Sequence, residues 1–310
     1  MLDSILLAAV ILLGSCVGSF LNVVIYRLPE GTFFSKGSRS RCPHCGVPIR
    51  WFDNLPVVSW LLLRGRARCC GNQISLRYPL VEALTAGLVV ALWVRFMAAG
   101  SEAVAQDWFR FALWAWFLAF LVACTFIDID HRILPDVLTK PTMVIGCLGA
   151  VLVPGLAGGH SWIREKPELD GLLQALAGLG AGFGLTWAVR AAAGKVFGRE
   201  AMGFGDVKFM AAIGAFVGWD GALTTFFLGT LLGAGYGVFH KWITGEAEVF
   251  FGPFLAVGAA ITVFFKQPIL VFVTETWPAW QATLHPSIML GVTVVCMVFI
   301  LVLIKRGRAR

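Results

Sequence analysis

The stretch "MGFGDVKFMAAIGAF", residues 202–216, places the carboxylate of Asp206 and the ammonium group of Lys208 at the start of a glycine-studded apolar run. A carboxylate next to hydrocarbon is costly, so it either marks the boundary of a membrane-spanning segment or carries a function. Small residues let neighbouring helices approach closely, and four glycines flank the acid: Gly203, Gly205, Gly214 and Gly218. The stretch therefore predicts the start of a helix that is packed within a membrane.

The composition of the whole chain extends this prediction. Hydrophobic residues make up 58% of the 310 residues, charged residues make up 14%, and the mean hydropathy is +0.80. A soluble domain of this length needs more polar surface, so the sequence predicts an all-α polytopic membrane protein. Apolar runs long enough to span a bilayer as helices lie at about 3–25, 79–98, 108–127, 137–156, 170–193, 207–219, 221–239, 250–266 and 287–304. The run 207–219 is short and is expected to form a tight hairpin with the next run, which gives eight or nine transmembrane helices.

The placement of basic residues predicts the topology. The net charge is +7, and nine arginine and lysine residues lie between the first two runs, from Arg27 to Arg77. Cytoplasmic loops carry an excess of Lys and Arg, so this segment is expected in the cytoplasm and the N-terminus outside. Nine spans also place the tail "KRGRAR" inside, so we prefer nine. The first apolar run lacks a basic n-region and is interpreted as a retained span, not a cleaved signal peptide.

The insert at 26–78 contains four cysteines in a pattern similar to a zinc knuckle. Cys42 and Cys45 form C-x2-C followed by glycine, and the adjacent pair Cys69-Cys70 precedes another glycine. Two sulfurs at the C-x2-C spacing can reach one tetrahedral ion, and a small loop-rich insert gains much of its folding energy from a metal. The second pair departs from this spacing, because Ala67 stands where the partner of Cys70 would be.

Three interpretations of these cysteines remain open. In the first, zinc is bound by Cys42, Cys45, Cys70 and a fourth ligand, which is Cys69 or His44. In the second, the knuckle is degenerate and holds no metal. The third, a disulfide, is disfavoured because the cytoplasm is reducing.

A second group of acids lies at the expected cytoplasmic end of the third span. The segment "CTFIDIDHRILPDVLTKP", residues 124–141, contains Asp128, Asp130 and Asp136. Under the nine-span topology Asp128 and Asp206 lie at similar depth on one side of the membrane. Two neighbouring carboxylates do not both ionise easily, so one can act as general base on water and the other as general acid on a peptide carbonyl.

Each acid also has a structural interpretation. Asp136 follows a proline and precedes an apolar run, which is typical of a helix N-cap. Asp130 and His131 are interpreted as solvated loop residues, and Asp206 is a second candidate N-cap. Asp128 ends an apolar stretch, where a carboxylate opposes the helix dipole, so capping does not explain it.

Six segments in order resemble the bacterial type IV prepilin peptidases: "GSFLNVVIYRLP" at 18–29, "CPHCG…IRWFDNLPVVSWLLLRGR" at 42–66, "ISLRYPLVE" at 74–82, "FIDIDHRILPDVLT" at 126–139, "GFGDVK" at 203–208 and "FGPFLAVG" at 251–258. The resemblance implies an intramembrane aspartic protease of the G-x-G-D type. Such an enzyme cleaves the basic leader from prepilins and pseudopilins at the cytoplasmic face of the bacterial inner membrane. The implied catalytic acids are Asp128 and Asp206.

The resemblance also implies S-adenosylmethionine as cofactor of a second activity, methylation of the new N-terminal residue. Most bifunctional members have C-x2-C twice, a pattern that Ala67 interrupts here. Glu82, one turn into the second span, is a candidate for the leader's positive charge or for methylation, or an acid that the helix start satisfies.

The predicted organisation is a first transmembrane helix at 1–25, a cytoplasmic knuckle-like insert at 26–78, a protease core at 79–266, and an extra helix with a basic tail at 267–310. The expected partners are prepilins and membrane lipid. No aromatic-interleaved basic patch indicates nucleic-acid binding. The alternative function is an ion or proton-coupled transporter, which predicts acids near the middle of the bilayer.

Overall fold

The computed structural model describes residues 2–32, 40–97, 105–158, 162–198, 202–245 and 250–278. In these ranges the chain forms helices and loops without a named strand, which confirms the all-α class. The chain divides into two compact units, Met1–Phe264 and Phe265–Arg310. The last predicted span, 287–304, and the basic tail lie outside the described residues.

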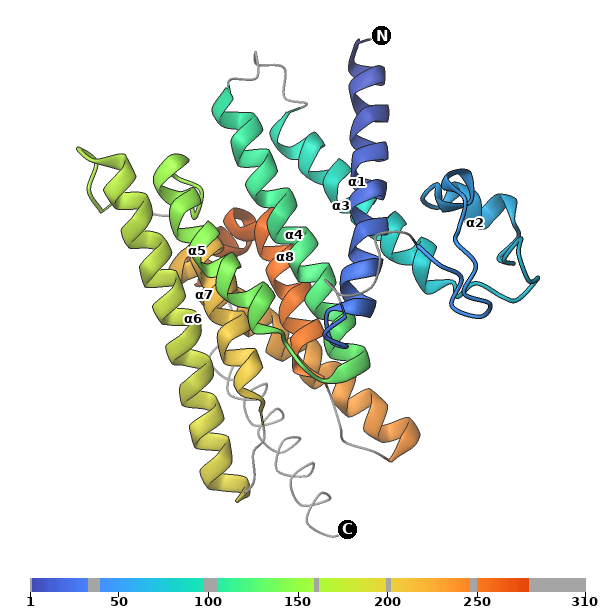
Figure 1. Cartoon of the computed structure of the whole chain (residues 1–310). Helices are drawn as coiled ribbons and strands as arrows, with labels where there is room; N and C mark the ends of the chain where they lie inside the picture. Colours follow the sequence, from blue (N-terminus) through green and yellow to red (C-terminus); the bar gives the residue numbers. More distant parts are fainter. Residues whose placement is uncertain are drawn as a thin grey trace. The chain divides into compact units, whose positions relative to one another are not determined.

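Eight α-helices occur in the described ranges (Figure 1): α1 Leu2–Arg27, α2 Val58–Leu62, α3 Arg77–Phe96, α4 Ala105–His131, α5 Asp136–Leu152, α6 Pro167–Phe197, α7 Phe204–Thr244 and α8 Phe251–Val271. Two short elements accompany them, the 3-10 helix Trp51–Asn54 and the π-helical segment Phe272–Thr276. Six of the described helices are long and apolar enough to cross a membrane, namely α1, α3, α4, α6, α7 and α8. The chain is therefore a multi-pass membrane protein, while the count of eight or nine spans stays a prediction.

The two apolar runs on either side of residue 220 belong to one element, α7, with a break inside it. Gly218 has φ 77° and ψ 176°, a conformation that side-chain-bearing residues rarely adopt, and the helix is interrupted there. The interruption lies two residues before Asp220, close to where the sequence predicted the turn.

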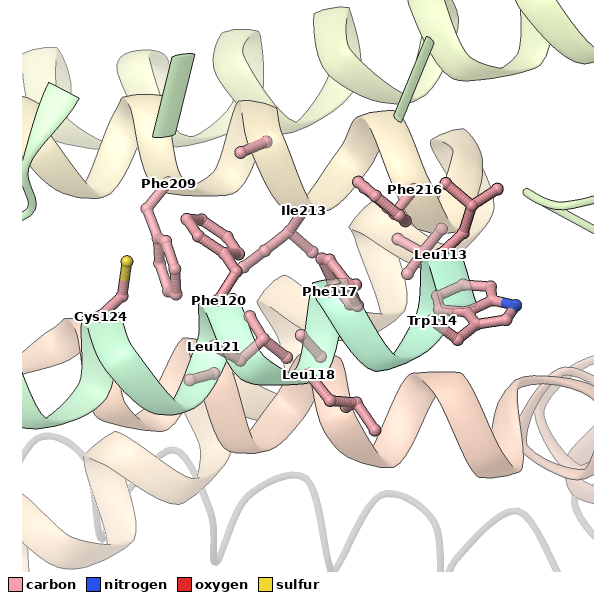
Figure 2. Close-up of a cluster of buried hydrophobic side chains, with 14 of the residues drawn as sticks. Leu113, Trp114, Phe117, Leu118, Phe120, Leu121, Cys124, Phe209, Ile213 and Phe216 are labelled. Carbon is pink, nitrogen blue, oxygen red and sulfur yellow. The ribbon is translucent and has the colours of Figure 1, made fainter. Parts of the chain in front are cut away.

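An aromatic core holds α4 against the first half of α7. Phe117 stacks on Phe216 with ring centroids 4.7 Å apart, and Phe120 packs on Phe209 at 5.4 Å. Figure 2 shows these side chains interleaved between the two ribbons, with Cys124 at one end of the cluster. The pairing is antiparallel, because residue numbers rise along α4 as they fall along α7. It therefore brings the last turn of α4 to the first turn of α7.

Glycines allow two other helix pairs to approach at backbone distance. A Cβ atom added to Gly178 of α6 would lie 2.1 Å from the carbonyl oxygen of Gly214 in α7, and α6 and α7 run side by side (Figure 1). A Cβ atom added to Gly18 of α1 would lie 2.6 Å from the Cα atom of Glu82 in α3. The helix-packing role predicted for Gly214 is thus confirmed.

Candidate functional site

The end of α4 and the start of α7 meet at an open pocket of about 330 Å³. Asp128 and Asp206 both line this pocket, and their carboxylates are close enough to interact electrostatically. Both residues are buried, with 7% and 9% of their surface exposed. The cationic side chains of Arg132 and Lys208 contribute to the wall of the pocket. The structure thus brings together the two acids that the sequence singled out.

The carboxylate of Asp128 lies against the start of α8. The backbone N–H of Gly252 donates a hydrogen bond to it. A Cβ atom on Gly252 would lie 2.5 Å from Oδ2 of Asp128, so only glycine allows this approach. The dipole at the C-terminal end of α4 disfavours a carboxylate, whereas the dipole at the N-terminus of α8 favours one. The start of α8 therefore stabilises the Asp128 carboxylate. No local pattern in the sequence assigns a role to Gly252, although "FGPF" places a glycine and a proline at a helix start.

Asp206 is the third residue of α7 and reaches back to its N-cap. The N-cap residue is Gly203, whose backbone N–H donates to the Asp206 carboxylate. This contact is half of a capping box. Gly205, in turn, lies against Leu134, whose Cβ atom would be 3.2 Å from a side chain added there. Asp206 is thus not the N-cap itself, and Gly205 of "GFGD" allows a close contact with Leu134 beside the acid.

The prediction that Asp130 and His131 lie in a loop is wrong. Both residues are exposed, but they form the last turn of α4, which is longer than the apolar run. Asp130 pairs with Arg77, which also donates to the carbonyl of Phe126 at 3.2 Å. This ion pair connects the start of α3 to the end of α4 and gives Asp130 a structural role.

The predicted N-cap role of Asp136 is wrong. Pro135 is the N-cap residue of α5, with the extended backbone that proline favours, so Asp136 becomes the first helical residue. Its carboxylate forms ion pairs with Lys140 at 2.8 Å and with Lys208 at 2.6 Å. Asp136 therefore joins the start of α5 to the start of α7 beside the pocket.

The four cysteines of the insert form one cluster. The sulfur atoms of Cys42, Cys45, Cys69 and Cys70 all lie within 4.8 Å of one another. Cys42 faces Cys70 at 3.7 Å and Cys45 faces Cys69 at 3.3 Å, distances of free thiols and not of disulfides. His44 does not belong to this group of four clustered side chains. The set of four sulfurs fits a tetrahedral thiolate metal site.

Two similar turns build this cluster. In the first turn, Gly46 donates to the carbonyl of Cys42 at 2.9 Å, and in the second, Gly71 donates to the carbonyl of Ala67 at 2.7 Å. Ala67 therefore holds the backbone position that corresponds to Cys42. Cys69 is the residue that supplies the fourth sulfur instead, one position before Cys70.

The thiols differ in acidity. Backbone hydrogen bonds from Cys45 and His44 lower the pKa of Cys42 to about 6. The side-chain hydrogen bond with Cys45 raises the pKa of Cys69 to about 12. The thiolate is the form that binds a metal, and the lowered pKa of Cys42 favours that form, whereas the raised pKa of Cys69 disfavours it.

Glu82 connects the insert to the membrane helices. It is buried in α3, and its Oε2 atom accepts a hydrogen bond from the backbone N–H of Val57 at 2.7 Å. The side chain of Ser19 in α1 is a second partner. Val57 is the N-cap residue of α2 and has φ 60°. The helix dipole alone therefore does not account for Glu82, because its carboxylate also has these two hydrogen-bond partners.

Comparison with known proteins adds an independent line of evidence. Residues 12–96 match the Bacterial Peptidase A24 N-terminal domain, and residues 115–238 match the Type IV leader peptidase family. A Prepilin leader peptidase/N-methyltransferase of Aeromonas hydrophila is 36% identical over 288 residues, which cover 84% of this chain and 91% of the relative. The chain belongs to the type IV leader peptidase family.

Two further relatives of this family extend the comparison. A Prepilin leader peptidase/N-methyltransferase of Myxococcus xanthus is 40% identical over 237 residues, covering 76% of this chain and 63% of the relative. The Type 4 prepilin-like proteins leader peptide-processing enzyme of Escherichia coli is 36% identical over 271 residues, covering 82% and 91%. No solved structure matches the chain. The leader peptidase match at 115–238 contains both pocket aspartates, whereas Gly252 lies beyond it.

Proposed function

We propose that this protein is an intramembrane aspartic endopeptidase that removes the leader peptide from type IV prepilins. The observation that carries the proposal is the shared pocket of Asp128 and Asp206, two buried carboxylates at adjoining helix ends in a leader peptidase family member. The relatives are named as prepilin leader peptidases, which supports the substrate class.

The two acids divide the chemistry of peptide hydrolysis between them. One carboxylate, as general base, takes a proton from a water molecule, whose oxygen attacks the scissile carbonyl carbon. The other, as general acid, donates its proton to the carbonyl oxygen, which gives a tetrahedral gem-diol. As the C–N bond breaks, the first carboxyl group passes the proton taken from water to the leaving nitrogen, and a gem-diol hydroxyl returns its proton to the second carboxylate. The two carboxyl groups share one proton and titrate as a pair. The roles of base and acid therefore belong to the pair and not to either residue alone.

The depth of the pocket supports cleavage at the membrane boundary. Asp128 lies three residues before the end of α4, and Asp206 is the third residue of α7. A prepilin consists of a basic leader and a hydrophobic helix, so its cleavage site would lie at this boundary, on the cytoplasmic side of the inner membrane under the positive-inside tendency. The transporter alternative requires acids near the middle of the bilayer, and these acids lie at helix ends.

Two cofactors belong to the proposal. Zinc, held by Cys42, Cys45, Cys69 and Cys70, would give the small insert a fixed fold. S-adenosylmethionine would donate a methyl group to the new N-terminus. Its support is the word N-methyltransferase in the relatives' names.

The test is intact-mass analysis of a prepilin incubated with the purified protein and S-adenosylmethionine. We expect loss of the leader mass and a further gain of one methyl group. Asp128→Asn and Asp206→Asn should each remove cleavage by at least about a thousandfold, since each variant loses an acid or base of the dyad. Asp130→Asn, which changes an ion pair outside the pocket, serves as the matched control and should retain cleavage. Wild-type cleavage by an inserted Asp128→Asn or Asp206→Asn variant would contradict the assignment.

A further inference from the structure

A second open pocket lies in the insert and shares no lining residue with the aspartate pocket. Its volume is about 560 Å³. Trp60 forms part of the wall, and its indole N–H donates to the carbonyl of Ile74 at 3.1 Å. The backbone N–H of Ile74 donates in turn to the carbonyl of Gly65 at 2.7 Å. These hydrogen bonds hold together the two chain segments that face each other across the groove. The backbone of the insert therefore defines the shape of the groove.

Two arginines without acid partners line this groove. Arg64 and Arg66 flank Gly65, and neither forms an ion pair with a carboxylate in the described part of the chain. Gln73 and Ser75 add polar side chains from the facing segment. Gly65 has φ 69°, and a Cβ atom there would lie 3.0 Å from the Trp60 ring, so glycine is needed between the arginines. The groove thus offers positive charge and hydrogen-bond donors to an anion.

Exposed leucines lie next to this groove along the chain, and one of them lines it. Leu61 and Leu62, in α2 just before the arginines, are 61% and 77% exposed, and Leu76, which lines the groove, is 63% exposed. Apolar side chains next to cationic ones are typical of segments that lie in the membrane interface, with the leucines toward the acyl chains and the charges at the headgroups.

The chain geometry places the groove at the membrane boundary. Leu76 is the N-cap residue of α3, one of the helices long and apolar enough to span the membrane. The hydrogen bond from Val57 to Glu82 attaches the residue before α2 to a point about 8 Å along α3, five residues after its start. The leucines of α2 are therefore held close to the level where α3 enters the bilayer.

We propose that this groove binds the phosphate headgroup of an anionic phospholipid from the surrounding bilayer, with Leu61 and Leu62 against its acyl chains. The guanidinium groups of Arg64 and Arg66 match phosphate oxygens in geometry and charge. The basic leader of a prepilin would be repelled by the same two arginines, which distinguishes this surface from a leader-binding site. The inference does not depend on the peptidase chemistry, because it concerns residues outside the aspartate pocket.

The test uses the full chain in detergent micelles, titrated with phosphatidylglycerol or phosphatidylcholine and observed by native mass spectrometry. Wild-type protein should bind phosphatidylglycerol in preference to phosphatidylcholine. Arg64→Gln/Arg66→Gln should weaken phosphatidylglycerol binding by about 30-fold, because each basic residue near an anionic lipid surface contributes roughly a factor of five. The matched control, Arg41→Gln/Arg50→Gln, removes the same charge from the insert at positions that do not line the groove.

A second measurement reports on the groove directly. Hydrogen exchange of the backbone at 58–76 should slow in nanodiscs containing phosphatidylglycerol relative to phosphatidylcholine alone, and this difference should vanish in the Arg64→Gln/Arg66→Gln variant. An equal loss of binding in both double variants would overturn the site and indicate general charge attraction. Equal protection by free glycerol phosphate would overturn the lipid as occupant and favour a soluble anion. An unchanged melting temperature of the variants excludes misfolding as the cause.

Discussion

Gly252 contacts one of the two pocket aspartates and leaves no room there for a side chain. Its backbone N–H donates to Asp128, and a Cβ atom in its place would lie 2.5 Å from the carboxylate oxygen. We therefore expect Gly252→Ala to displace Asp128 and to reduce cleavage by about a hundredfold, as misplacements of about 1 Å do in other active sites. The measurement is the initial rate of leader removal.

The matched control for this substitution is Gly184→Ala in α6. A Cβ atom on Gly184 meets no heavy atom within 4 Å outside its own neighbours and helix backbone. This variant should cleave at the wild-type rate. If Gly252→Ala also keeps the wild-type rate while inserted and folded, the contact with α8 does not position Asp128.

The sequence predicted the two pocket acids because their chemistry is local. Asp206 begins an apolar run and Asp128 ends one, so both stand out in a chain with few charges. The roles of Asp136 and Gly252 depend instead on residues 72 and 124 positions away, Lys208 and Asp128 respectively. Such pairings arise from tertiary packing, which no local pattern in one sequence specifies.

At the scale of elements, the second turn of the cysteine cluster differs from the first in the position of one cysteine, and this difference can be tested. Ala67 occupies the backbone position that corresponds to Cys42, and Cys69 supplies the fourth sulfur. We expect Cys69→Ser to lower the zinc content of purified protein from about one equivalent, because three thiolates bind zinc less tightly than four. Adding Ala67→Cys to Cys69→Ser should restore it. Metal analysis that finds no zinc in the parent protein would favour the degenerate knuckle.

The contact between α6 and α7 depends on glycine at particular positions only. A Cβ atom on Gly178 would lie 2.1 Å from the carbonyl oxygen of Gly214, whereas a Cβ atom on Gly180 meets nothing within 4 Å. Gly178→Ala should therefore destabilise the protein by about 1–3 kcal/mol through overpacking. Gly180→Ala should be neutral or stabilising by up to about 1 kcal/mol, because alanine favours the helix. Thermal unfolding in detergent compares the two, and equal melting temperatures would contradict the close packing.

Helix lengths show where the sequence pattern was insufficient at this scale. The apolar run of the third span ends at about residue 127, yet α4 continues to His131, and its last turn includes Asp130, which forms an ion pair with Arg77. A hydropathy profile indicates which residues can lie in lipid, but it gives no information about ion pairs between helices. A turn was predicted close to the observed break in α7, since the apolar run 207–219 is short for a full span and the next run begins after Asp220.

At the scale of the whole molecule, the Glu82 carboxylate joins the start of α2 in the insert to the membrane helices. Glu82 accepts a hydrogen bond from the backbone of Val57, interacts with Ser19 of α1, and lies where Gly18 lets α1 approach α3. We expect Glu82→Ala to release the insert, because the N–H of Val57 loses its acceptor, while the helices stay packed. Hydrogen exchange at 55–62 should become faster by about tenfold, as expected for the loss of about 1.4 kcal/mol from one hydrogen bond to a charged group.

Glu82→Gln is the informative companion, because its amide oxygen can still accept from Val57 while the charge is lost. Slow exchange in Glu82→Gln together with fast exchange in Glu82→Ala identifies the hydrogen bond as the link. If methylation of the cleaved prepilin falls in Glu82→Ala and leader removal does not, the position of the insert matters for the second activity alone. Equal exchange in all three proteins would show that the insert is held by other contacts, and the boundary position inferred for the Arg64 and Arg66 groove would then lose its main support.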